Sequence, residues 1–449
     1  MGIMKRNALT VIGLGKLGLP TAACLSDKGF RVIGVDIDPH VIDAINNGVS
    51  PLYEPGLGEM MERVKGRFTA TDDYQYAIDN SAVIFIFVGT PSESDGSFST
   101  RYVEEVTRRI ASNIRDRDDF PIIVLRSTVL PGVTDGLVKT LLEEITGKCC
   151  GIDFGLCYNP EILALGSVIH DFLNPDMVVI GESDQRSGKQ LSEIYSNVCE
   201  NRPPVIKTSL ANAEMAKISL NVFLTLKMSF ANTLAEICEM IPQGDVDAVS
   251  DILGRDRRIG RKFLTGATGW GGPCFPRDTK AFISLAERNK SQAKLAEATD
   301  AVNDIQCQRI IELVGQKLAG LKGKRIAVLG LTYKPNTDLV LESESIRIIN
   351  LLLKEGATLS LYDPAGLANA REELGEDVVY YAQSAVDCLR DADLCIMATP
   401  WEEFNELTPE DFAGNMNSPV LLDCWRQLRR PEFTEKLDYL AIGLNTLNE

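Results

Sequence analysis

Residues 8–36 read ALTVIGLGKLGLPTAACLSDKGFRVIGVD, and this stretch decides how the chain folds. It opens with a short, nearly continuous apolar run, Ala8–Gly13, which is typical of a strand buried on both faces of a parallel sheet. A helical pattern follows over Leu19–Lys28, and a second strand pattern covers Phe30–Asp36. The stretch therefore predicts a strand–helix–strand unit with two parallel strands.

A glycine-rich turn joins the first strand to the helix. Its residues 13–18 read GLGKLG, a GxGxxG pattern in which glycine permits a tight turn and lets backbone N–H groups approach a pyrophosphate. Alone, such a pattern is often turn chemistry and nothing more. Here Asp36 ends the second strand, where its carboxylate can accept hydrogen bonds from an adenosine ribose and would repel a 2′-phosphate. We therefore predict a dinucleotide site that takes NAD in preference to NADP.

The pattern of the first unit continues and then changes to helix. Further strand-like runs occur at Ala82–Val88, Pro121–Leu125 and Met177–Ile180, with helical stretches between them. From Ala211 to Met240 the chain has neither proline nor glycine, which predicts a long helix, and further helical patterns follow through residue 314. The middle of the chain is therefore predicted to be helical.

A second α/β unit is predicted after the helical middle. Its strands are expected at Lys324–Leu329, Thr358–Tyr362, Leu394–Ala398 and Val420–Leu422, with a helix at Ser345–Glu355. The predicted fold class is α/β, with two Rossmann-like, doubly wound domains joined by a central helical domain. We place these domains at residues 1–203, 204–318 and 319–449.

Composition excludes several classes of protein. The 449 residues carry a net charge of −17, which would repel a polyanion, so we expect neither nucleic-acid binding nor a basic membrane patch. Apolar runs are far shorter than a membrane span, and the start lacks the apolar core of a signal peptide, so we expect the cytosol. Eleven scattered cysteines and two histidines predict reduced thiols and no metal site.

A loop at residues 266–278 presents one cysteine. It reads GATGWGGPCFPRD, with four glycines, two prolines and Cys274. Glycines permit close backbone approach and prolines restrict the backbone, so the cysteine is held at a defined place and does not fall on a periodic buried face. This favours a catalytic nucleophile, while a phosphate-binding or structural loop with an incidental cysteine stays open as the alternative.

Two other sets of residues are candidates for binding. Lys217 and Asn221 lie four residues apart on the long predicted helix, so both project from one face and could donate hydrogen bonds to an oxyanion. A solvated helix face is the alternative. In the last unit, Gly330 follows a strand without a GxGxxG, so no dinucleotide is expected there, and Lys334 could either meet a phosphate or be a surface lysine.

Together these motifs resemble the UDP-glucose/GDP-mannose dehydrogenase family over nearly the whole chain. The resemblance rests on the cofactor turn and on nine further motifs, which are Tyr53–Leu57, Val88–Pro91, Ser127–Val129, Asn159–Glu161, His170–Pro175, Ala213–Asn221, Gly269–Asp278, Leu331–Thr337 and Tyr362–Pro364.

The resemblance implies a function for each domain and a reaction. It implies an N-terminal NAD domain, a central helical domain that forms a homodimer, and a C-terminal domain that binds a nucleotide sugar. It also implies polysaccharide biosynthesis as the context. The sugar C6 alcohol would be oxidised to a carboxylate by two NAD, through a thiohemiacetal and a thioester on Cys274. Lys217 and Asn221 would stabilise oxyanions, Asp278 with Thr128 would order water, and Glu161 would assist thioester hydrolysis.

The same resemblance implies two sets of binding residues. The cofactor set is Gly13, Gly15, Lys16, Leu17, Gly18, Asp36, Gly89, Thr90 and Thr128. The substrate set is Glu161, Leu163, Lys217, Asn221, Arg258, Phe263, Gly271, Lys334 and Arg426.

Several positions depart from the family pattern. Leu165 stands where the family has a glutamate, and Leu341 where it has an arginine. Asp423–Arg426 reads DCWR in place of a DGRN-like ending, and Arg426 is a candidate to compensate. Val41 replaces a cofactor-side lysine, which is expected to loosen NAD contacts modestly.

These departures bear on the substrate. UDP-glucose is the first choice, because HDFLNPD and GGPCFPRD look most like the UDP-glucose branch of the family. UDP-N-acetylhexosamines and GDP-mannose are the alternatives within the family. Outside it, a two-electron β-hydroxyacid dehydrogenase would not need Cys274, and a nucleotide-binding protein without catalysis would need none of the catalytic residues.

Overall fold

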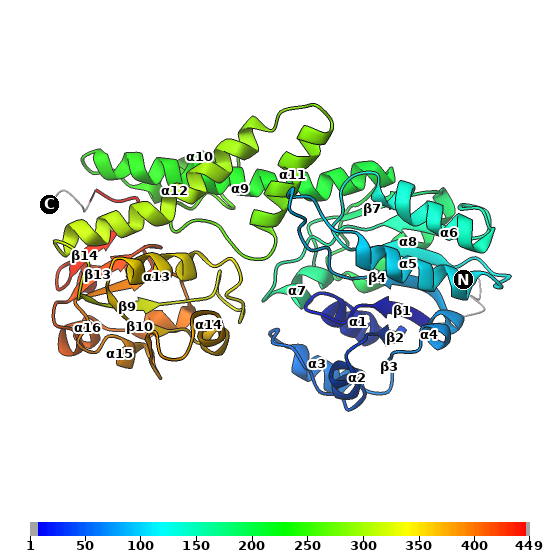
Figure 1. Cartoon of the computed structure of the whole chain (residues 1–449), viewed down its shortest axis with the longest axis horizontal. Helices are drawn as coiled ribbons and strands as arrows, with labels where there is room; N and C mark the ends of the chain where they lie inside the picture. The colour runs from blue at the N-terminus through cyan, green and yellow to red at the C-terminus, as the bar shows by residue number, and fades with distance from the viewer. Residues whose placement is uncertain (1–7, 446–449) are drawn as a thin grey trace. The chain divides into compact units, whose positions relative to one another are not determined.

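The structure is a computed structural model and describes residues 8–445. The chain separates into two compact units, Met1–Leu220 and Asn221–Glu449, and helix α9 (Leu210–Met240) contains the boundary between them. Each unit contains one sheet with helices on both faces (Figure 1). The α/β fold class with two Rossmann-like domains and a helical middle is confirmed. The predicted boundaries after residues 203 and 318 stay predictions, because the structure separates two units and not three.

The first unit is built on an eight-stranded sheet in the order β3-β2-β1-β4-β5-β6-β7-β8. Neighbouring strands run parallel except for the pair β6–β7. Strands β2 and β3 extend to one side of β1 and β4 begins the other side, which is the doubly wound arrangement. The strands are β1 (Ala8–Ile12), β2 (Arg31–Val35), β3 (Phe68–Thr71), β4 (Ser81–Ile86), β5 (Ile122–Leu125), β6 (Gly155–Tyr158), β7 (Val178–Glu182) and β8 (Val205–Thr208).

Two apolar layers cover this sheet. One contains residues of α1, α3, α7 and α8, and the other contains residues of α4, α5 and α6. Helix α1 is buried almost throughout, as a helix must be when the sheet lies on one side and other helices on the other. The helices are α1 (Gly18–Asp27), α2 (Pro39–Asn46), α3 (Leu57–Val64), α4 (Tyr74–Asn80), α5 (Arg101–Ile114), η1 (Val133–Val138), α6 (Lys139–Thr146), α7 (Val168–Leu173) and α8 (Gln185–Val198).

The second unit contains the rest of the helical middle and a second sheet. Helices α10 (Val246–Arg255), α11 (Phe275–Arg288) and α12 (Lys294–Lys317) follow α9. The sheet has six parallel strands in the order β11-β10-β9-β12-β13-β14. They are β9 (Arg325–Leu329), β10 (Thr358–Tyr362), β11 (Tyr380–Tyr381), β12 (Leu394–Met397), β13 (Val420–Asp423) and β14 (Asp438–Ala441).

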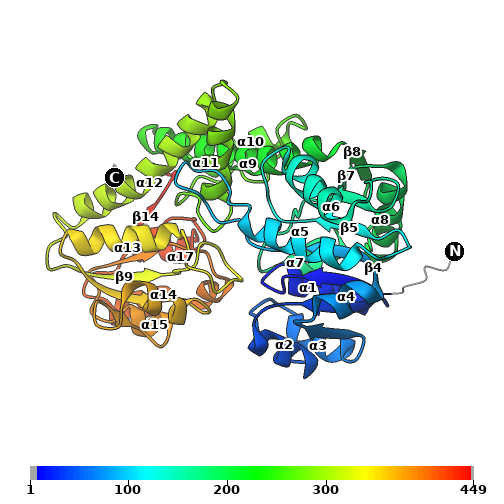
Figure 2. The ribbon, with the colours of Figure 1, turned by 45° about the vertical axis from the view of Figure 1, so that its right-hand side comes forward.

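The helices of the second sheet lie on both of its faces. Figures 1 and 2 show α13 (Glu344–Lys354) and α15 (Ala385–Cys388) on opposite sides of the strands, and their buried residues belong to different apolar layers. The other helices of this part are α14 (Leu367–Leu374), η2 (Glu402–Glu406), α16 (Pro409–Asn415) and α17 (Pro431–Thr434).

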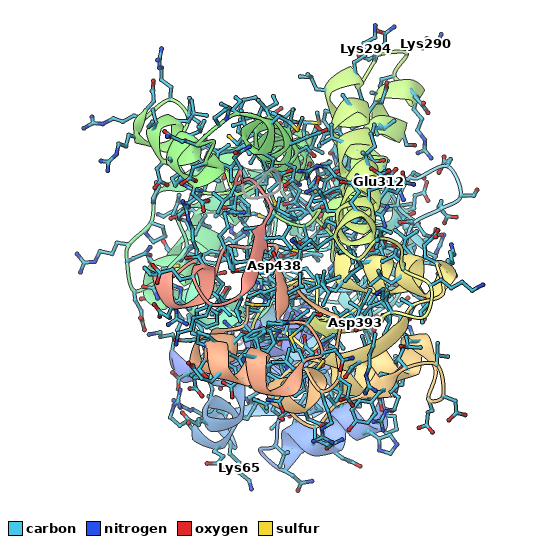
Figure 3. All side chains as sticks on the ribbon, turned by 90° about the vertical axis from the view of Figure 1, so that its left-hand side faces the viewer. Lys65, Lys290, Lys294, Glu312, Asp393 and Asp438 are labelled. Carbon is cyan, nitrogen blue, oxygen red and sulfur yellow. The ribbon has the colours of Figure 1, made fainter. Side chains whose placement is uncertain are left out.

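Charged side chains lie mainly outside these layers. The labelled side chains of Lys65, Lys290 and Lys294 point away from the ribbon (Figure 3). None of the eleven cysteines, which all lie within residues 8–445, forms a disulfide, and burial raises the pKa of the Cys24 thiol to about 12. Across residues 8–445 we find no helix with the length and apolarity to cross a bilayer.

Candidate active site

The glycine turn after β1 has no room for side chains. Gly13 has a φ of +90°, and a Cβ atom there would lie 2.7 Å from the Phe87 carbonyl oxygen. A Cβ atom at Gly18 would lie 1.9 Å from the Gly13 carbonyl oxygen, whereas at Gly15 it would face open space. No side chain caps α1. Its Leu19 N–H donates to the Gly15 carbonyl at 3.0 Å and Pro20 has no N–H, which leaves the Gly18 N–H at the start of the helix for a phosphate oxygen. The turn therefore fits the diphosphate of a dinucleotide.

Asp36 is fixed beside this turn. The Leu14 N–H donates to its Oδ2 at 2.7 Å, and the N–H groups of Ile37 and Asp38 donate to its Oδ1 at 2.8 and 3.0 Å. The carboxylate is partly exposed and keeps a lone pair on Oδ2 that can accept from a ribose hydroxyl. The arrangement fits an NAD adenosine at the end of β2.

The segments after β4 and β5 are tied together. Thr90 donates from Oγ1 to the Thr128 carbonyl at 2.7 Å, and Ser127 donates from Oγ to the Val88 carbonyl at 2.7 Å. Both threonines are buried, while Gly89 leaves open space where a side chain would stand. Three residues predicted to bind the cofactor therefore come together in one rigid edge.

Glu161 and Lys217 are brought together in the first unit. The Lys217 Nζ on α9 lies 3.9 Å from the Glu161 Oε1, and Glu161 also accepts from the Leu163 N–H at 3.3 Å. Lys217 is 5% exposed and Glu161 is 7% exposed. Burial contradicts the alternative that Lys217 belongs to a solvated helix face. A buried lysine beside a buried carboxylate is typical of a functional site, although structural ion pairs share this feature.

The loop after Glu161 is held by a residue that was not predicted as functional. The Glu54 carboxylate is buried and accepts from the Gly166 and Val168 N–H groups at 2.8 and 2.7 Å. It thereby caps α7 and fixes the loop that contains Leu165. The Tyr53–Leu57 motif thus contributes a loop anchor, a contact that spans more than a hundred residues and leaves no local signal.

The cysteine loop of the second unit is anchored by polar side chains of α9 and α12. Asn303 accepts from the Trp270 N–H at 2.7 Å and donates to its carbonyl at 2.8 Å. Gln306 donates to the Ala267 carbonyl at 2.5 Å, and the Trp270 indole N–H donates to the Ser229 Oγ at 2.9 Å. These hydrogen bonds fix the backbone of the loop at Ala267 and Trp270.

We expect Asn303→Ala to destabilise the protein. The substitution removes both hydrogen bonds to Trp270 and leaves buried backbone groups unpaired, so the free energy of unfolding is expected to fall by about 2–3 kcal/mol. Urea unfolding measures it. Asn289→Ala is the matched control, because Asn289 is exposed and donates a single bond to Leu285. Equal, small losses in the two variants would contradict the anchoring role of Asn303.

Close backbone approach explains the paired glycines of the loop. A Cβ atom at Gly271 would lie 2.0 Å from the Glu342 carbonyl oxygen, to which Gly272 donates its N–H at 2.9 Å. Gly272 has a φ of +82°, and a Cβ atom there would meet the Tyr333 ring at 2.4 Å. Gly271, predicted in the substrate set, therefore has a packing role in the structure, and its contact with substrate stays a prediction.

Cys274 immediately precedes α11 and is partly buried. Its carbonyl accepts from the Asp278 N–H at 2.8 Å, so the two residues are one helical turn apart. Asp278 is fully buried, and its Oδ2 accepts from the Asn221 amide at 2.6 Å while its Oδ1 accepts from Arg277 at 2.9 Å. The N-terminus of a helix stabilises negative charge, so Cys274 lies where charge that develops on its sulfur during a reaction is stabilised.

Asn221 and Lys217 each contact a carboxylate in the structure, Asp278 for Asn221 and Glu161 for Lys217. Their predicted role as donors to an oxyanion of the substrate stays a prediction. One amide hydrogen of Asn221 remains for another acceptor. Asn221 is 6% exposed, so the solvated-face alternative is wrong here as well.

The other predicted substrate residues differ in their surroundings. Arg258 is exposed and pairs with Asp256 at 2.6 Å. Phe263 is partly exposed and has a φ of +66°, an unusual backbone for an aromatic residue and one that often marks a functional loop. Lys334 is partly buried, so it is not simply a solvated surface lysine.

Arg426 is occupied inside the chain. Its guanidinium forms two hydrogen bonds to the Asp247 carboxylate, at 2.6 and 3.1 Å, and a third to the Ile442 carbonyl at 2.6 Å. These contacts tie β14 and the segment after β13 to α10. They do not support the expectation that Arg426 compensates for Leu341, because a substrate would have to displace Asp247. Its contact with substrate stays a prediction.

Asp363 repeats the position of Asp36 in the second sheet, and the sequence indicated it only as part of the Tyr362–Pro364 motif, without a role. Its Oδ2 accepts from the N–H groups of Leu331 and Thr332 at 2.7 and 3.0 Å and from the Trp401 indole at 3.0 Å. Its Oδ1 accepts from the Gly366 N–H at 2.6 Å and from a second backbone N–H. The carboxylate is 2% exposed and has no lone pair left for a ribose.

Comparison with known proteins agrees with these sites. The chain matches the NAD binding domain of the UDP-glucose/GDP-mannose dehydrogenase family over residues 7–199, its central domain over 211–305 and its UDP binding domain over 327–430. It is 38% identical over 437 residues to the UDP-glucose 6-dehydrogenase AglM of Haloferax volcanii, covering 97% of this chain and 99% of that protein.

Two solved structures are similar in fold. The UDP-glucose dehydrogenase from Pyrobaculum islandicum has a TM-score of 0.89 at 33% identity, covering 98% of this chain and 99% of that one. The UDP-N-acetyl-mannosamine dehydrogenase from S. aureus has a TM-score of 0.80 at 26% identity, covering 98% of this chain and 99% of that one.

The similarity covers both units, and the glycine turn with Asp36 fits the coenzyme that the family uses. The chain belongs to the UDP-glucose/GDP-mannose dehydrogenase family and is an NAD-dependent nucleotide-sugar dehydrogenase.

Proposed function

We propose that the protein oxidises the C6 alcohol of UDP-glucose to the carboxylate of UDP-glucuronate. The observation that carries this proposal is Cys274, which an anchored loop presents at the N-terminus of α11, one turn from the buried Asp278. A two-electron dehydrogenase has no need for a thiol held in this way. NAD supplies the hydride acceptor for each of the two oxidations.

The proposed reaction on Cys274 balances in four steps. First the alcohol loses a hydride from C6 and a proton from oxygen, which gives the aldehyde. The Cys274 sulfur then bonds to C6, and a proton goes to the aldehyde oxygen, which gives a thiohemiacetal. Loss of a second hydride and of that proton gives the thioester. Water adds to its carbonyl, the sulfur leaves and regains a proton, and the acid is released.

The surrounding residues have separate roles in this proposal. Lys217 and Asn221 stabilise the oxyanions that form at C6, since both are buried donors. Asp278 with Thr128 orders the water, and Glu161 assists thioester hydrolysis as a base. Two contacts support these assignments, Lys217 with Glu161 and Asn221 with Asp278. Each places a side chain that can donate a hydrogen bond to an oxyanion beside a carboxylate that can accept a proton from water.

The substrate proposal has support and a rival. The relative from Haloferax volcanii is named a UDP-glucose 6-dehydrogenase, and the similar structure from Pyrobaculum islandicum is that of a UDP-glucose dehydrogenase. UDP-N-acetyl-mannosamine is the second candidate, favoured by the similar structure from S. aureus and by Leu165 on the loop that Glu54 anchors. A leucine there offers no hydrogen bond to a sugar hydroxyl.

A panel of nucleotide sugars tests the proposal. UDP-glucose, UDP-N-acetylglucosamine, UDP-N-acetyl-mannosamine and GDP-mannose are each incubated with NAD, while NADH is followed by absorbance and the product by mass spectrometry. We expect the highest kcat/KM with UDP-glucose and two NADH for each acid formed. One NADH for each product would favour the two-electron class, and no NADH with any of the four would favour a binding protein.

We also propose a homodimer through α9. On the part of this helix in the second unit, Phe223, Phe230 and Ile237 recur every seven residues and therefore share one face. Phe223 is 61% exposed and Phe230 is 51% exposed. Large apolar side chains repeated along one helix face are typical of an interface between subunits. A cytoplasmic location and a role in polysaccharide biosynthesis stay predictions.

Phe230→Glu is expected to shift the protein from dimer to monomer, because the two helices of a symmetric interface would each carry the new charge. Sedimentation velocity at micromolar concentration measures the change in mass. Ile305→Glu serves as the control, since Ile305 is equally exposed but lies on α12. A wild-type monomer at these concentrations would contradict the proposed dimer.

A further inference from the structure

A row of residues follows the carboxyl ends of five neighbouring strands in the first sheet. Val35, Ile12, Ile86, Leu125 and Tyr158 are register partners across β2, β1, β4, β5 and β6. The backbone pairing continues for one more residue on β1, β4, β5 and β6. The row is therefore Asp36, Gly13, Phe87, Arg126 and Asn159, and its first two members belong to the coenzyme site described above.

Arg126 is a buried cation in the middle of this row. It is 4% exposed, and its guanidinium carbon lies 4.9 Å from the Phe87 ring centre and 5.7 Å from that of Phe172. Its Nη1 donates to the Tyr195 hydroxyl at 2.6 Å, whereas its Nε is buried without an acceptor. Among residues 8–445, no carboxylate forms an ion pair with it.

The contacts of Arg126 do not neutralise its charge. The Tyr195 hydroxyl donates a hydrogen bond to the Asn159 Oδ1, and the Asn159 Nδ2 donates to the Val179 carbonyl at 2.7 Å. The three groups in this series of hydrogen bonds, Tyr195, Asn159 and the Val179 carbonyl, are all neutral, and burial raises the pKa of the Tyr195 hydroxyl. A buried cation without a paired anion is costly, so a protein that keeps one is expected to pair it with an anion from outside the chain.

The glycine turn is an anion site on the same row as Arg126. Phe87, on whose ring Arg126 packs, is also the residue that crowds the turn, because a Cβ atom at Gly18 would lie 3.2 Å from the Phe87 Cβ. Parallel strands lie about 4.8 Å apart, so Arg126 is roughly 10 Å from Gly13 along the row. Charges that are shielded from water interact over such distances with little screening by salt.

We propose that Arg126 is a positioning residue for NAD. The Arg126 guanidinium supplies the positive charge that balances the negative charge of the coenzyme diphosphate. The guanidinium packs near the rings of Phe87 and Phe172, and binding of the anionic coenzyme offsets the free-energy cost of burying its positive charge. The proposal does not depend on which sugar is oxidised or on the role of Cys274.

Arg126→Met tests the proposal through binding and stability together. Methionine fills the space between the rings without the charge. We expect the Kd values of NAD and of ADP-ribose, which has the diphosphate but no nicotinamide, to rise at least tenfold by isothermal titration without sugar nucleotide. We expect the melting temperature of the free protein to stay the same or rise, because an unpaired buried charge is removed.

Two further variants complete the test. Arg126→Lys keeps the charge and is expected to bind both ligands within about threefold of the wild type. Arg186→Met is the matched control, since Arg186 packs on the Phe120 ring at 3.8 Å on the exposed side of α8 and should change neither Kd.

Three results would overturn the proposal. The first is an Arg126→Met protein that binds both ligands with the wild-type affinity. The second is a loss of NAD binding with ADP-ribose binding intact, which would move the contact to the nicotinamide. The third is an Arg126→Met protein that melts well below the wild type without coenzyme, or does not fold, which would mean that the charge serves the fold itself.

Discussion

Cys274→Ser is expected to lower the formation of nucleotide uronate by about 10³-fold or more, because a serine hydroxyl at this position is a far weaker nucleophile than a thiolate. The substitution changes one atom at the start of α11, so the anchored loop and the coenzyme site should remain intact. The expected signature is an unchanged Kd for NAD by titration together with the loss of acid by mass spectrometry.

Cys149→Ser is the matched control for this variant. Cys149 is the exposed cysteine of the first unit and belongs to no proposed site, so its loss should leave turnover unchanged. Acid production by Cys274→Ser at the wild-type rate would exclude the thioester route and favour the two-electron class of dehydrogenase. Accumulation of the aldehyde, trapped with a hydrazine, would show that the first oxidation does not need the thiol.

Lys217→Met has the second largest expected effect. Removing one donor to an oxyanion typically costs about 3–4 kcal/mol of transition-state stabilisation, so kcat is expected to fall by roughly 10²- to 10³-fold. The KM for the nucleotide sugar should change much less, since the donor acts on charge that develops during the reaction. Steady-state kinetics separate the two parameters.

The double variant Glu161→Gln, Lys217→Met separates catalysis from charge balance. Lys217→Met alone leaves the buried Glu161 carboxylate without its cation, which would lower stability, and Glu161→Gln removes that charge. We expect the double variant to recover stability, but its kcat is expected to lie about 10²- to 10³-fold below that of Glu161→Gln alone, which already lacks the proposed base. Lys189→Met on the exposed side of α8 is the neutral control. A kcat equal to that of Glu161→Gln would mean that Lys217 serves Glu161 and not the reacting atoms.

Local pattern was sufficient to predict much of the fold. β1, β2, β4, β5 and β7 are continuous apolar runs, and α9 is long and free of proline and glycine, so each was found within about two residues. Five strands were not predicted, and four of them lack this signal. β3 is short with an alternating pattern, β6 begins at a glycine, β8 is largely exposed, and β11 has only two residues. The fifth is β14, whose last three residues are apolar and buried. These strands form because a neighbouring strand provides hydrogen-bond partners, which no local window contains.

The candidate site likewise contains some residues that the local sequence predicts and others that depend on contacts with distant parts of the sequence. Cys274, Asp278 and the GxGxxG turn are set by short spacing, so their types and places could be predicted. Asn303 and Glu54 act on backbone groups far away in the sequence, and nothing near them indicates it. Asn221 was predicted as a donor, but its partner across 57 residues could not be.

Gly330 and Asp363 reproduce the geometry of Gly13 and Asp36, yet with the carboxylate turned inward onto its own loop. The same arrangement of glycine and aspartate thus leaves room for a coenzyme in the first sheet, whereas in the second it only fixes its own loop. With one such coenzyme site among residues 8–445, the protein is expected to hold one NAD at a time. The proposed reaction uses two, so a used NADH would have to leave and a fresh NAD bind while the half-oxidised sugar is still present. The proposed covalent bond to the Cys274 sulfur would keep that sugar from dissociating.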